Sequence, residues 1–283
     1  MGATLEQLSQ ELGALRTAAA AVGRDLRQVL TEYVQVLGRS LSRQLGLSGF
    51  HLCTQVYPEA FLALSVAERA ALQQNIQTLG HQLSASLFEI LQPLTSLDLE
   101  TAVDPSSLLE IWETMETDMI EILRTGSRRI NEQFQESQIM KVKSLDKLLA
   151  LAAEAQDAGR SVTNPPHLLK ALVDPKDLLE ENLEPVVVIY LQIADLEFTH
   201  SELMSWRQKL RPLRQKLMQV QQTYAQKQEE HLTAEAIAAW RASWTDTPFL
   251  NGAFSSGASL IKNALNEASE SDDDPLDGGA MGE

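Results

Sequence analysis

The residues that could do chemistry are few, and they lie far apart in the sequence. Glu197 and His200 have the spacing Glu-x-x-His, which di-iron helix bundles need twice. The sequence has no second copy of this spacing. We therefore interpret the two residues as a solvated pair near a helix start, and we expect no metal or cofactor site. The five histidines fall in unrelated segments: His51, His81, His167, His200 and His231.

Cys53 is the only cysteine of the chain, and His51 lies two residues before it. In a strand this spacing would place both side chains on one face, where a histidine could activate a thiolate. No orienting acid and no oxyanion loop accompany them. Their neighbours Phe50, Leu52 and Val56 are apolar, so we predict a buried structural thiol.

Four glutamates share one side of a predicted helix, but no histidine accompanies them. We interpret them as a solvated acidic face rather than as metal ligands. The sequence also has no Gly-rich phosphate loop, no G-x-S-x-G and no C-x-x-C. These absences predict a protein that is not an enzyme, although an active site of scattered residues stays open. The four glutamates of this acidic face are Glu110, Glu113, Glu116 and Glu121.

Composition and charge favour a cytoplasmic, largely helical protein. A single cysteine among 283 residues indicates a reducing compartment, and we find no secretory signal and no apolar stretch long enough to span a bilayer. The formal net charge is −16. Residues 267–283 hold seven acids and no base, which leaves 32 acids against 23 bases, a net charge of −9, in residues 1–266. An acidic body disfavours attraction to nucleic acid or anionic lipid.

Hydrophobic periodicity predicts a mainly α fold, an elongated bundle of long antiparallel helices that pack like coiled coils. The first helix should span residues 4–46 and end at the sequence GLSG. Its apolar positions follow an alternating spacing of three and four, which indicates a seam along a neighbouring helix. They are Leu5, Leu8, Leu12, Leu15, Ala19, Val22, Leu26, Val29, Tyr33 and Val36.

Capping signals mark two further helices. Ser65 and Glu68 form a capping box that should open a second helix, and Pro93 should stop it. Asp104 as N-cap and Pro105 at the first helical position should open a third helix, which we expect to run to about residue 157.

Residues 166–198 change character, because the second half is dense in β-branched residues. We predict two strands of a small β-hairpin here. A helix running straight from 177 to 230 remains the alternative. Thr199 and Glu202 have capping-box spacing and favour a new helix that begins at 199.

The last long helix should span about 200–244 and carries five basic residues and no acid between 203 and 226. Four of the five bases flank an apolar seam, where charges on a neighbouring helix would meet them. Glu11, Asp25 and Glu32 on the first helix, and Glu116 and Asp118 on the third, could supply those charges. Pairing with these helices or with a second copy of the chain is the prediction. As a partner-binding surface we propose Leu203, Trp206, Arg207, Lys209, Leu210, Leu213, Arg214, Lys216 and Leu217.

The chain thus divides into a helical bundle (1–248), an amphipathic linker segment (249–266) and a disordered acidic tail (267–283). A peripheral membrane protein that uses 249–266, and a regulatory nucleic-acid-binding protein that uses the basic helix 203–228, are the alternatives. Trp206 and Tyr224 lie in the seam, so bases would find no stacking platform on the exposed face.

Three segments resemble uncharacterised, largely helical cyanobacterial proteins: FHLCTQVYPEAFLALS (50–65), IADLEFTHSELMSWRQKL (193–210) and AAWRASW (238–244). The resemblance implies a cyanobacterial cytoplasmic protein and brings no activity and no functional residues. From the residues themselves we predict a non-catalytic adaptor, scaffold or assembly factor that binds another protein.

Overall fold

The computed structural model describes residues 4–142, 145–147, 149–150, 167–171 and 186–243. The chain divides into a larger unit, residues 6–228, and a smaller unit made of residues 1–5 and 229–283. In the smaller unit the described part is mainly the end of the last helix. The predicted linker at 249–266 and the predicted tail at 267–283 lie outside the described residues.

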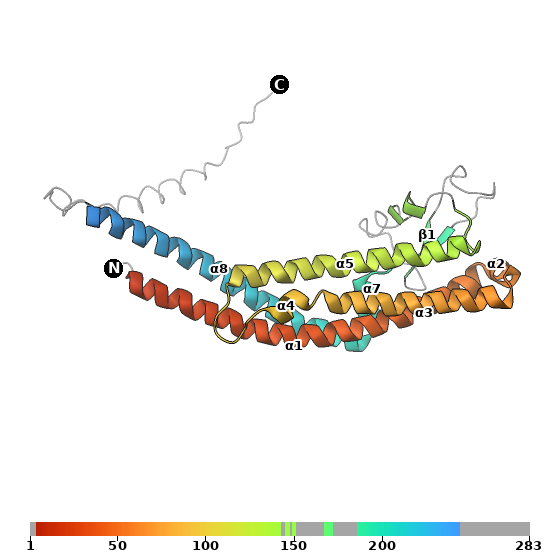
Figure 1. Cartoon of the computed structure of the whole chain (residues 1–283), viewed down its shortest axis with the longest axis horizontal. Coiled ribbons are helices and arrows are strands. Elements are labelled where there is room, and N and C mark those ends of the chain that lie inside the picture. Colours follow the sequence, from red (N-terminus) through yellow and green to blue (C-terminus); the bar gives the residue numbers. More distant parts are fainter. Residues whose placement is uncertain (1–3, 143–144, 148, 151–166, 172–185, 244–283) are drawn as a thin grey trace, which may run out of the picture. The chain divides into compact units, whose positions relative to one another are not determined.

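The larger unit is mainly α, as the sequence predicts, and holds four long helices that lie side by side (Figure 1). They are α1 (Leu5–His51), α3 (Val66–Glu89), α5 (Pro105–Glu136) and α8 (Ser201–Ser243), the last of which continues into the smaller unit. The short elements are the π-helix η1 (Leu52–Val56), α2 (Pro58–Ala63), α4 (Gln92–Ser96), β1 (Leu168–Ala171), β2 (Val186–Ile189) and α7 (Ile193–Thr199).

Cross-helix contacts show that α1 runs antiparallel to both α3 and α8. Between α1 and α3, Ser84 donates to the Gly38 carbonyl, and Gly80 lies against Ser42. Between α1 and α8, Arg39 pairs with Glu202 near one end, whereas Lys227 pairs with Glu11 near the other. The antiparallel bundle predicted from the sequence is therefore confirmed.

Helix α1 lies deepest in the bundle. Every predicted seam position is buried or half-buried, but from Ala19 onward Leu30, Leu37 and Leu45 are buried as well. The prediction that α1 ends at residues 46–49 is wrong. Gly49 continues the helix and is buried, and a Cβ there would lie 3.0 Å from the Ile76 Cδ1 of α3. Its role is close packing rather than helix termination.

Both predicted N-caps are confirmed. The Ser65 and Glu68 side chains form a reciprocal capping box, and the Asp104 carboxylate accepts from the Ser106 N–H. Helix α3 ends at Glu89, ahead of Pro93.

The predicted extension of the third helix to about 157 is wrong, since α5 ends at Glu136. Gln138 adopts the left-handed conformation (φ 59°), and Ile139 and Met140 then donate to the Phe134 carbonyl. This arrangement terminates the helix without the glycine that usually marks such an end.

Strands β1 and β2 pair antiparallel, with Leu168 opposite Ile189 and Ala171 opposite Val186, which confirms the hairpin. The second strand is shorter than predicted, because residues 193–199 form α7. The predicted capping box at 199 is also wrong: Thr199 closes α7 by donating to the Asp195 carbonyl, and α8 begins at Ser201.

Candidate functional site

The apolar seam of α8 packs inside the chain. Leu203, Leu210 and Leu217 are buried, and Trp206 and Leu213 are half-buried against the same core. These residues therefore stabilise the bundle by removing apolar surface from water. Only side chains on the outer part of this helix can reach a partner.

Two of the predicted partner-binding bases join a polar cluster between α5, α7 and α8. The Arg207 guanidinium lies 3.3 Å from Glu116 Oε1 and 3.5 Å from Glu197 Oε1. Arg214 lies 3.5 Å from the other oxygen of Glu116. Glu116 was one of the acids that the sequence offered to this helix, so this pairing is confirmed.

Helix α1 closes the cluster through Tyr33, whose hydroxyl donates to Glu197 Oε1 at 2.7 Å. Burial of the ring and this bond to a carboxylate raise the pKa of the Tyr33 phenol far above its usual range. A phenol held in this way stays a hydrogen-bond donor at every physiological pH. The cluster thus fixes four elements relative to one another.

Further along α8, at residues 224–227, two more contacts join this helix to α1. Lys227 Nζ lies 3.1 Å from Glu11 Oε2, and the Arg16 Nε donates to the Tyr224 hydroxyl at 2.9 Å. Glu11 was predicted to take part. Asp25, Glu32 and Asp118 make no ion pair with α8 within the described part of the chain.

The remaining predicted bases are exposed. Lys209 lies over the Trp206 ring, with Nζ 3.6 Å from its centroid, and so covers one face of that ring. Lys216 and Arg211 are exposed as well and have no acid within 4.0 Å among the described residues. As a partner-binding surface, the nine residues of α8 stay a prediction.

Cys53 is buried, which confirms the predicted structural thiol. Burial raises the pKa of this thiol to about 11. His51 ends α1 and Cys53 lies in the π-helix, so the shared strand face considered from the sequence does not form.

Glu197 does not form the solvated pair expected with His200, because its carboxylate belongs to the polar cluster. Three of the four acidic residues on α5 are exposed as predicted, whereas Glu116 is half-buried between two arginines. Across the described residues, no three or more His, Cys, Asp or Glu side chains gather to hold a metal ion.

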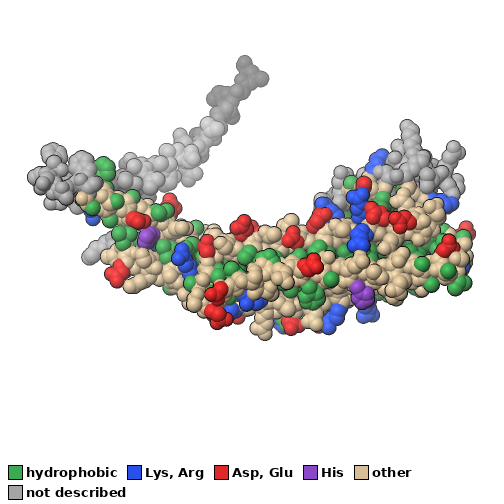
Figure 2. Space-filling model, in the orientation of Figure 1, with side chains coloured by type: hydrophobic (Ala, Val, Ile, Leu, Met, Phe, Trp, Pro, Cys, Tyr) green, Lys and Arg blue, Asp and Glu red, His purple; other side chains and the backbone are tan. Residues whose placement is uncertain are grey.

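An apolar surface at one end of the larger unit was not predicted. Phe50, Leu62 and Val66 are 63, 64 and 80% exposed, and Leu47 is half exposed. Hydrophobic side chains also reach the surface where α2 and the start of α3 lie (Figure 2). A pocket of about 310 Å³ opens at Phe50, and its described lining has no charged residue. We call Leu47, Phe50, Leu62, Val66 and this pocket the apolar end.

Two buried polar residues of α5 also escaped sequence analysis. The Asn131 amide accepts from the Ile189 N–H at 2.9 Å and donates to the Ile189 carbonyl at 2.7 Å. Ser127 accepts from the Leu191 N–H at 2.8 Å. The two side chains satisfy the edge of β2 as a third strand would. In the sequence these residues form only an isolated Ser-x-x-x-Asn on an apolar helix face. This spacing does not predict a contact with a strand unless the position of β2 is known.

No described helix combines the length and the apolar character needed to cross a membrane. Comparison with known proteins finds no matching family, no matching curated protein and no matching solved structure. Function is therefore argued from the chain itself.

Proposed function

We propose that this chain is a non-catalytic protein that binds another protein, as an adaptor, scaffold or assembly factor, and that the apolar end is its contact surface. The observation that carries the proposal is the exposure of Phe50 at a pocket whose described lining has no charged residue, together with the exposure of Leu62 on α2 and Val66 at the start of α3. Clustered apolar side chains of this size on a surface are typical of protein interfaces.

The pocket fits an apolar anchor. Its walls include Phe50, Phe61, Leu72 and Ile76, while Gln73 and Gln77 supply uncharged polar groups. Arg69 supports this end, because it donates to the Leu62 and Leu64 carbonyls and lies over the Phe61 ring. The surface is thus held in place before a partner binds, which lowers the entropic cost of binding. An aromatic or branched apolar side chain of the partner would fill the pocket.

The outer face of α8 is a second contact region in this proposal, through Lys209, Arg214 and Lys216. It contributes less, because the leucines of that helix are committed to the core. Exposed bases of this kind act mainly on association rate and orientation.

Affinity capture with matched variants tests the proposal. Wild type, Phe50→Ser and Phe198→Ser are compared; Phe198 is the control because it is 81% exposed on α7, away from the pocket lining. We expect one protein to be captured by wild type and Phe198→Ser, and to be lost or at least tenfold reduced with Phe50→Ser. The captured protein must then bind the purified chain directly. Equal capture by all three proteins would refute the apolar end as the contact surface.

A further inference from the structure

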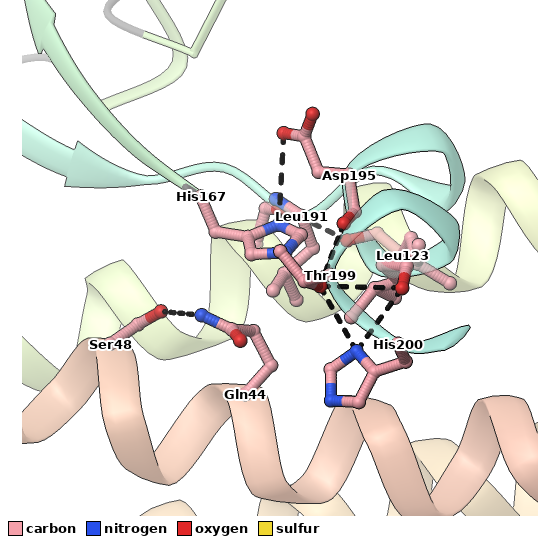
Figure 3. A network of polar contacts seen from close by, with 10 residues as sticks. Gln44, Ser48, Leu123, His167, Leu191, Asp195, Thr199 and His200 are labelled. Carbon is pink, nitrogen blue, oxygen red and sulfur yellow. Dashed lines mark hydrogen bonds and ion pairs between the residues drawn. The ribbon is translucent and has the colours of Figure 1, made fainter. Parts of the chain in front are cut away.

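His167 is a buried histidine placed directly before β1. Its side chain has 0% exposure, and its backbone is left-handed, with φ 66°. Its carbonyl accepts from the Tyr190 N–H at 2.9 Å and so extends the pairing of β1 with β2. Figure 3 shows the imidazole directed toward α7 and the junction with α8.

Neither ring nitrogen of His167 has a hydrogen-bond partner among the described residues. Asp195 Oδ2 lies 3.9 Å from Nδ1, which is too long for a hydrogen bond. A buried imidazole without partners is costly when neutral, and it is more costly when protonated, because a buried charge then lacks solvation. The site therefore selects the neutral ring.

The ionisable groups that face the ring come from α7 and from the residue after it. Asp195 of α7 is partly exposed, and its carboxylate would attract a protonated ring. His200 would repel it when both are charged; its Nδ1 lies 3.1 Å from the Leu196 carbonyl oxygen. Gln44 and Ser48 of α1 and Leu123 of α5 complete the surroundings in Figure 3, and none of them ionises.

The hairpin beside His167 is held to α5 by few bonds. The described polar contacts are those of Asn131 with Ile189 and of Ser127 with Leu191. These bonds break together if β2 leaves α5, whereas the contacts between α1, α3 and α5 do not depend on them. The hairpin also buries Val186–Ile189 in the core, and the Val187 N–H donates to the Tyr57 hydroxyl. Its release is therefore a local opening that loses this burial but leaves the contacts between the long helices in place.

We propose that His167 is an acid-sensitive contact: protonation of its buried imidazole releases the β1–β2 hairpin from α5. Above neutral pH the neutral ring stays packed and the hairpin is docked. As the pH falls, the released state binds a proton on His167 that the docked state excludes, and release becomes more favourable. This inference does not depend on the proposed partner-binding function.

The direction and size of the effect follow from linkage. Burial, assisted by the nearby His200, lowers the pKa of His167 to about 4. A solvated histidine has a pKa of about 6.5. Stability of the docked state is therefore fully present above pH 6.5 and is lost as the pH falls toward 4. The docked-to-released equilibrium should shift about 30-fold toward release between pH 7.5 and pH 5.0.

Hydrogen exchange of the full chain tests this proposal, with protection factors corrected for the intrinsic pH dependence of exchange. The probes are the Ile189 and Leu191 amides, with Leu79 and Leu83 of α3 as the reference for global opening. We expect protection of the first two to fall about 30-fold at pH 5.0 relative to pH 7.5 while the reference changes less than threefold. Loss of protection in both sets together would overturn the proposal, because it would show global unfolding.

Two variants assign the effect to His167. His167→Asn keeps a residue type that tolerates the left-handed backbone and removes the titrating ring, so the 30-fold change should disappear. Asp195→Asn removes a carboxylate 3.9 Å from the ring and should leave the change near 30-fold, because the docked state already excludes most of the proton at pH 5.0. If His167→Asn fails to fold, His167→Gln serves in its place, because it also removes the titrating ring and should abolish the change. An acid response that the folded His167 variant leaves unaltered would contradict the proposal.

Discussion

At the scale of single residues, the contacts of Glu116 show what charge does in this protein. Its two oxygens face Arg207 and Arg214 in a half-buried position, whereas the pair of Arg39 on α1 with Glu202 on α8 is mostly exposed. The pairing of Glu116 with the bases of α8 was predicted from the sequence, whereas the pair of Glu202 with Arg39 was not. Their energies should differ, because solvent screens the exposed pair and leaves the half-buried one strong.

Glu116→Gln should lower the free energy of unfolding by about 1–3 kcal/mol, since Arg214 loses its carboxylate and Arg207 keeps only that of Glu197. Glu202→Gln is the matched control and should cost about 0–1 kcal/mol. Urea unfolding followed by circular dichroism measures both. Equal costs for the two variants would contradict the assignment of Glu116 as the centre of the polar cluster.

At the scale of elements, the sequence predicted what depends on neighbouring residues. The capping signals at Ser65 and Asp104 lie within one helical turn, and both form as predicted. What failed depends on distant residues. Gly49 lies inside α1 and packs against Ile76, and nothing in residues 46–49 reveals that neighbour.

The same division holds for the candidate site. The pairing of Glu116 with Arg207 follows from seam positions and opposite charges, so it could be predicted. The apolar end could not, because Leu62 and Val66 lie where one short helix ends and the next begins, and no periodicity marks them. The bonds of Asn131 to Ile189 span 58 positions of the chain.

The contact between α1 and α3 gives a prediction at this scale. A Cβ on Gly80 would lie 3.2 Å from the Ser42 Cα, so Gly80→Leu forces the two helices apart. We expect it to destabilise the protein by about 1–3 kcal/mol. Gly13→Leu is the control, because nothing lies within 4 Å of a Cβ at that position of α1. It should stabilise the helix by up to about 1 kcal/mol.

Thermal unfolding of both glycine variants provides the measurement. The two substitutions are chemically identical, so a difference in sign between them reports the surroundings alone. If Gly80→Leu is as stable as wild type, α1 and α3 do not approach as closely as described.

At the scale of the whole molecule, the net charge of −16 disfavours nucleic acid as a partner relative to protein. The bases at 207, 214 and 227 already contact acids within the chain. Lys209 covers one face of the Trp206 ring, which would otherwise offer a stacking surface. Lys209, Arg211 and Lys216 stay exposed, but on an acidic chain, and Lys209 leaves a polyanion little of the Trp206 ring to stack on.

We accordingly predict weak retention on heparin, with elution below about 0.2 M NaCl. A chain truncated after residue 266 is the control, because it lacks seven acids of the C-terminal segment. It should elute only slightly later. Retention of the intact chain to high salt, with a steep dependence of affinity on salt concentration, would instead favour the nucleic-acid alternative.

The most direct test of the proposed partner binding is site-specific photo-crosslinking in cells that contain the natural partner. A photoreactive phenylalanine analogue replaces Phe50 in one protein and Phe198 in a second, so that both probes are exposed and of one chemical type. The account predicts a single crosslinked protein from position 50 and none from position 198. No crosslink from position 50, or the same products from both positions, would contradict it.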